Sequence, residues 1–79
     1  MYDQFTVELA VEMLDLCSHY NQEDETVMEV KLGIQRWVDT GDIEFLKDAY
    51  QAYYFATGFT VMGLPYRDIM NMLDKREGE

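Results

Sequence analysis

Apolar side chains recur at three- and four-residue spacing along most of this chain, and no other feature restricts its fold so strongly. This spacing places them on one face of an α-helix, which then has to be buried against other helices. Polar or glycine-containing breaks interrupt the pattern three times. We therefore predict a small all-α domain over residues 1–79, a bundle of three main helices and a shorter C-terminal helix.

Capping residues predict where the first two helices begin. The first helix is expected over residues 2–20, with Asp3 as its N-cap. The second is expected over about residues 23–40, and it contains Gly33, which costs about 1 kcal/mol relative to alanine. We therefore expect another helix to approach closely at Gly33. The alternatives for the start of the second helix are a Thr26–Glu29 capping box or an N-cap at Asn21 or Asp24.

Glycines mark the ends of the second and third helices. Gly41 and Gly58 lie where a left-handed residue commonly ends a helix, so the third helix is expected over residues 43–57. Pro65 suits the first turn of the last helix, because a proline has no amide hydrogen to leave unpaired there. Between these helices, residues 59–64 are apolar and either extended or one helical turn.

Composition excludes several classes of protein. With 48% apolar residues the chain is too hydrophobic for disorder, and no apolar run reaches the roughly 18 residues of a membrane span. The net charge of −10 opposes direct binding to nucleic acid or to anionic membrane surfaces. Cys17 is the one cysteine, so no internal disulfide forms. We expect a cytoplasmic protein.

The negative charge is concentrated in the first part of the sequence. Residues 1–30 contain eight acidic residues and no lysine or arginine, which accounts for −8 of the total −10. Three of these acids are spaced four and three residues apart, so they share one helix face despite their mutual repulsion. The acids that we predict to bind a partner are Glu8, Glu12, Asp15, Glu23, Asp24, Glu25 and Glu29.

No arrangement of residues predicts catalysis. His19 and Ser18 are the only histidine and serine, and neighbours in a helix do not face each other. Cys17 belongs to the apolar face of the first helix. The acids around Gly41 suit helix capping better than a metal site. We therefore assign no catalytic, cofactor-binding or metal-ligating residues and expect a protein that is not an enzyme.

These observations predict a binding module that meets a basic protein surface. A nucleic-acid-processing complex is the favoured partner, because surfaces that bind phosphates are positively charged. The alternative is a structural role, in which the protein self-associates or joins a larger assembly through the aromatic third helix. Tyr50 and Tyr54 are the predicted interface residues in that case.

In size and acidity the chain is similar to small phage-encoded inhibitors of host nucleases, the anti-CRISPR and antirestriction proteins. The resemblance implies a compact domain whose acidic face occupies a site for nucleic acid on the host enzyme. It also implies that the protein acts in the cytoplasm of the host. No motif is shared, so no site residue is carried over from that class.

Overall fold

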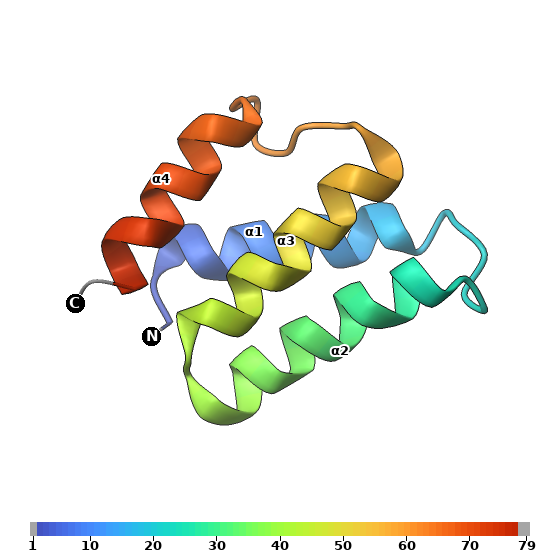
Figure 1. The fold of residues 1–79 in the computed structure, drawn as a ribbon, viewed down its shortest axis with the longest axis horizontal. Helices are drawn as coiled ribbons and strands as arrows, with labels where there is room; N and C mark the ends of the chain where they lie inside the picture. The colour runs from blue at the N-terminus through green and yellow to red at the C-terminus, as the bar shows by residue number, and fades with distance from the viewer. Residues whose placement is uncertain (1, 78–79) are drawn as a thin grey trace.

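Four α-helices make up most of residues 2–77, the part of the chain that this computed structural model describes (Figure 1). They are α1 (Gln4–Cys17), α2 (Glu25–Thr40), α3 (Ile43–Thr57) and α4 (Tyr66–Glu77). In Figure 1, α2 and α3 run antiparallel, α3 crosses α1, and α4 ends near the start of α1. α4 has 12 residues, against 14 to 16 in the others. The predicted all-α fold with a shorter last helix is confirmed.

Aspartate side chains cap the first three helices. Asp3 Oδ1 accepts a hydrogen bond from the Thr6 amide at 2.8 Å, and Asp42 Oδ1 accepts one from the Glu44 amide at 3.0 Å. Asp24 caps α2 through the Thr26 amide at 2.8 Å. Of the alternatives for α2, the cap at Asp24 is therefore confirmed, and the Thr26–Glu29 capping box is wrong.

The other ends of α2 and α3 follow the sequence prediction. Gly41 and Gly58 have φ of 75° and 70°. Their amides donate hydrogen bonds to the carbonyls four residues earlier, at 2.7 and 2.8 Å. The start of α4 differs slightly from the prediction, which placed Pro65 in the first turn. The Pro65 carbonyl accepts a hydrogen bond from the Ile69 amide at 3.2 Å, so Pro65 lies just before the first turn.

Residues 59–64 form an extended connector with a tight turn, which settles the open alternative. Val61 and Leu64 pair as an isolated antiparallel bridge, and the Leu64 amide donates to the Val61 carbonyl at 3.1 Å. Met62 and Gly63 between them have φ of 58° and 67°. Positive φ at both central residues is typical of a type I′ turn. This turn buries Val61 in the core.

α2 and α3 approach each other closely at Gly33. A Cβ at this position would lie 2.9 Å from the Ala49 Cβ and 3.1 Å from the Phe45 carbonyl oxygen. Real Cβ contacts essentially never come as near as 2.9 Å. The glycine therefore lets α2 and α3 pack backbone to backbone, as its position in the sequence predicted.

α1 is shorter than the helix predicted over residues 2–20. The helix ends at Cys17, not at residue 20, and Tyr20 and Leu14 are 41% and 39% exposed. Leu9, Met13 and Cys17 form the buried centre of its apolar face. The buried apolar residues contributed by the other helices are Val27, Val30, Ile34, Trp37, Ile43, Leu46, Ala49, Tyr50, Tyr53, Ile69 and Leu73.

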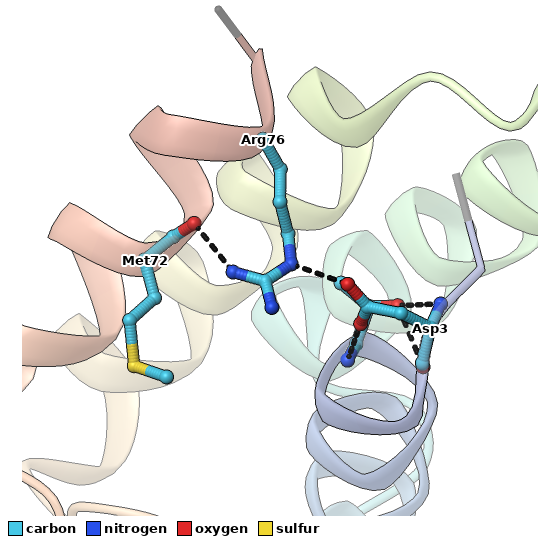
Figure 2. Close-up of polar contacts among 4 residues, drawn as sticks. Asp3, Met72 and Arg76 are labelled. Carbon is cyan, nitrogen blue, oxygen red and sulfur yellow. Dashed lines mark hydrogen bonds and ion pairs between the residues drawn. The ribbon is translucent and has the colours of Figure 1, made fainter. Parts of the chain in front are cut away.

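An ion pair joins the first and last helices (Figure 2). Arg76 Nε donates to Asp3 Oδ2 at 2.7 Å, and Arg76 Nη1 donates to the Met72 carbonyl at 2.8 Å. The guanidinium carbon lies 4.6 Å from the centre of the Phe5 ring. One carboxylate therefore caps α1 through Oδ1 and holds the end of α4 through Oδ2.

We expect Asp3→Ala to lower the free energy of unfolding by about 1 kcal/mol at neutral pH, because α1 loses its cap. Burial opposes ionisation of Asp3, but the Thr6 amide and Arg76 outweigh it and hold the pKa of this carboxyl below its usual value. A depressed folded pKa stabilises the protein above the unfolded pKa of about 3.9, and the stabilisation is lost as the pH falls through the folded pKa.

Urea unfolding of the two proteins between pH 7 and about pH 3 checks this expectation. The difference between wild type and Asp3→Ala should shrink as the pH falls. Asp48→Ala, an exposed position on α3, is the control and should show a small difference that changes little. A difference for Asp3→Ala that stays constant across this range would contradict the assigned role.

Candidate functional site

Three predicted acids form a row on the outer face of α1. Glu8 and Asp15 are exposed and Glu12 is half-buried, and together with Val11 they line a shallow hollow. The core-facing residues of α1 lie on other faces of the helix. Glu8 accepts a hydrogen bond from the Gln4 side chain at 3.0 Å. We call these three residues the carboxylate row.

No basic side chain neutralises the carboxylate row within the part of the chain that the structure describes. The ion pairs found there are those of Arg76 with Asp3 and of Lys47 with Asp74 and Glu77. The hydrogen bonds to Asp74 and Glu77 raise the pKa of Lys47, which keeps this base charged and bound to α4. The negative potential of the row therefore faces solvent.

A second row runs along α1 beside the first. Val7, Val11 and Leu14 precede the three acids by one residue each, and they are 45%, 60% and 39% exposed. They line one side of a groove of about 420 Å³ between α1 and α2, together with Tyr2 and Val38. We call this feature the apolar groove. Val11 lines both hollows, so the apolar groove and the carboxylate row form one continuous surface.

Sequence reasoning missed the apolar groove. The signal was present, because Val7, Val11 and Leu14 share a four- and three-residue spacing that lies off the stripe through Leu9 and Met13. Isolated exposed apolar residues are ordinary, whereas a row of them rimmed by charge is typical of an interaction site.

The remaining predicted acids are distributed over other places. Glu23 and Glu25 are exposed beside the turn that follows α1. Asp24 is used in capping α2. Glu29 lines a separate groove between α2 and α3 that also contains Arg36. The structure thus brings Glu8, Glu12 and Asp15 together and places Glu29 elsewhere.

The predicted aromatic interface is partly wrong. Tyr50 is 0% exposed, so in this fold it has no surface to offer a partner, and burial raises its pKa to about 12. Its position on the core face of α3 is the physical reason. Tyr54 is half-buried, and its ring centre lies 4.5 Å from that of Tyr66. An intermolecular role for Tyr54 stays a prediction.

The described residues also bear on metals and membranes. Among residues 2–77 no three histidine, cysteine or carboxylate side chains come together in a way that would hold a metal ion. Asp42 instead caps α3, and Asp39 accepts a hydrogen bond from Gln35 at 3.0 Å.

None of the helices over residues 2–77 combines the length and apolar character needed to cross a membrane.

Comparisons with protein-family models, with curated proteins and with solved structures found no match to this chain.

Proposed function

We propose that this protein is a binding module without enzymatic activity, which docks the carboxylate row and the apolar groove of α1 onto a basic protein surface. The partner surface carries lysine and arginine side chains opposite the row and an apolar ridge that fills the groove. Binding covers that surface and so blocks or regulates it.

The observation that carries this proposal is the pairing of the two rows on one helix. The carboxylates of Glu8 and Glu12 are adjacent and form no ion pair within residues 2–77, so they repel each other, and this costs a few tenths of a kcal/mol in an isolated helix. Valine side chains that are about half exposed lack the free energy that full burial of their apolar surface would provide. A partner that is both basic and apolar relieves both costs, because it supplies opposite charge and buries Val7 and Val11.

A groove that normally holds nucleic acid is the favoured target. Such a surface is positively charged to neutralise phosphates. The row has three carboxylates over seven residues, which at a helix rise of 1.5 Å gives about one charge per 5 Å. A DNA strand carries one charge per roughly 3.4 Å, so the two spacings are compatible. We propose that the protein acts in the same way as the small phage inhibitors that it resembles in size and acidity.

Differential capture tests the proposal. Wild-type protein, Glu8→Lys/Glu12→Lys/Asp15→Lys and the control Glu44→Lys/Asp48→Lys/Asp68→Lys are immobilised separately and exposed to host lysate at low salt. Both variants change the net charge of −10 by the same amount, because each contains three reversals. The control residues are exposed and lie on α3 and α4.

The proposal predicts a protein that is retained by wild type and by the control, is lost from the row variant and elutes when the salt is raised. The same proteins on all three columns, or none on any, would count against α1 as the binding surface. A labelled oligonucleotide bound to the recovered protein should then be released by one equivalent of this module. An oligonucleotide that stays bound would contradict occlusion of a nucleic-acid site.

A further inference from the structure

The walls of the apolar groove are lined by apolar and aromatic side chains of both α1 and α2. Tyr2 packs against Trp37 of α2, with the two ring centres 5.1 Å apart. The Tyr2 hydroxyl donates hydrogen bonds to the carbonyls of Trp37 and Val38, which fixes its ring against the α2 wall. The groove is therefore formed before a partner arrives, and this lowers the cost of binding.

These walls favour an occupant that pairs its own backbone groups. The amides and carbonyls of α1 and α2 along the groove are used within the two helices, and the Tyr2 hydroxyl already donates to α2. An extended segment in the groove would leave its N–H and C=O groups facing apolar side chains, which is costly. An α-helix avoids this cost, because its backbone hydrogen bonds are internal.

The exposed apolar residues of α1 also have the spacing of a helix-packing seam. Val7, Val11 and Leu14 are four and three residues apart, as are successive d, a and d positions of a coiled-coil heptad. At a rise of 1.5 Å per residue they extend over about 10 Å. Glu8 and Asp15 then occupy the e positions beside this seam, where opposite charge selects the partner helix.

We propose that the ridge seated in the apolar groove is an amphipathic α-helix of the partner, with lysine or arginine side chains beside its apolar seam. This inference rests on the proposed function and specifies the partner. The apolar side chains of that helix bury Val7, Val11 and Leu14, and its basic side chains reach the carboxylate row. Charge alone would attract any basic surface, whereas the seam selects a helix with the same repeat.

Three synthetic peptides of about 21 residues, long enough to form a helix, are added separately to the full chain. All have leucine at a and d, lack tryptophan and are used at concentrations at which sedimentation shows monomers. The first has lysine at e and g, beside the seam. The second has the same composition with its lysines on the opposite face, and the third has glutamate at e and g.

Trp37 is the one tryptophan of the chain and lines the groove, so its fluorescence reports an occupant. The first peptide should bind saturably, change this fluorescence and shift the NMR signals of the Val7 and Val11 methyl groups. The second should bind at least about tenfold more weakly, because its lysines cannot reach the carboxylate row. The third should bind more weakly than the first, because like charges oppose docking.

Val11→Asp and Leu32→Asp are a matched pair of variants. The two side chains are 60% and 50% exposed, and each variant adds one negative charge. Leu32 lies on α2 and lines other hollows. Val11→Asp should weaken the first peptide at least about tenfold, although the added charge attracts lysine, because the seam loses an apolar side chain. Leu32→Asp should leave its affinity unchanged.

The helical assignment would be overturned by a first peptide that does not bind saturably, by equal affinity of the first two peptides or by unchanged binding in Val11→Asp. The capture from lysate keeps this failure distinct from failure of the proposed function. Captured protein that still depends on the carboxylate row would then show that the docking surface is right and its occupant is not a helix. Peptide binding as predicted without such capture would support the helical occupant and contradict the proposed function.

Discussion

Gly33→Leu is expected to unfold the protein. The first carbon of any side chain at this position would lie 2.9 Å from the Ala49 Cβ and 3.1 Å from the Phe45 carbonyl oxygen. Both neighbours belong to α3, and neither is the mobile end of a long side chain. Because the Cβ itself already overlaps α3, leucine cannot be placed here unless α2 and α3 separate. Overpacking costs about 1–3 kcal/mol for a few extra methylenes in a core that can adjust, and more where backbone must move.

Gly33→Ala gives a graded version of the same test. Alanine gains about 1 kcal/mol of helix propensity over glycine. The contact with α3 opposes this gain, and we expect a net loss of about 1–2 kcal/mol in the free energy of unfolding. Ala49→Gly removes the Ala49 Cβ, which is one of the two atoms that the new Cβ at position 33 would meet. The double variant Gly33→Ala/Ala49→Gly should therefore lose less stability than the sum of the two single losses.

Urea unfolding monitored by circular dichroism measures these differences. Leu32→Ala is the matched control, because Leu32 is the neighbour of Gly33 on α2 and is 50% exposed. It should change stability by less than about 0.5 kcal/mol. A Gly33→Ala protein as stable as wild type, or a cooperatively folded Gly33→Leu protein, would show that the approach of α2 to α3 is not required.

Local chemistry made most helix boundaries predictable. Asp42 and the left-handed glycines at 41 and 58 act through hydrogen bonds to residues a few positions away, so the sequence contains all the partners. Gly33 was also informative, because a glycine inside a helix is costly without a close contact. The start of α2 needed the structure, since Asp24 and Thr26 both suited a cap.

Features that depend on several helices at once could not be read from periodicity. The exposure of Val7 and Val11 follows from how α2 packs beside α1, and the burial of Tyr50 follows from how α3 packs against α4. The ion pair of Asp3 with Arg76 joins residues 73 positions apart. The spacing of the acids in the sequence therefore predicted the carboxylate row. The apolar groove beside it depends on the packing of α1 against α2, which the sequence does not show.

The largest expected effect on binding comes from Glu8→Lys/Glu12→Lys/Asp15→Lys. None of these side chains is among the buried residues of α1, so the variant should keep its helical circular dichroism. Facing a basic partner, three reversals replace attraction by repulsion, and like charges at an interface cost several kcal/mol. Because about 1.4 kcal/mol is a factor of ten, we expect the affinity to fall at least about 100-fold.

Val11→Asp tests the apolar part of the same surface. Val11 lines both the apolar groove and the hollow of the carboxylate row. A carboxylate there adds negative charge, so pure electrostatic attraction would strengthen binding. Loss of affinity is expected instead if the partner buries this side chain. Unchanged or tighter binding would exclude Val11 from the contact.

The most direct measurement is the dissociation constant of the recovered partner as a function of salt concentration, determined by calorimetry for wild type, the row variant and the Glu44→Lys/Asp48→Lys/Asp68→Lys control. Wild type and control should bind with similar affinity, and both should weaken steeply as salt rises. The row variant should bind at least about 100-fold more weakly at low salt, with a flatter salt dependence. Equal constants for all three proteins, or a larger loss in the control, would show that the carboxylate row of α1 is not the docking surface.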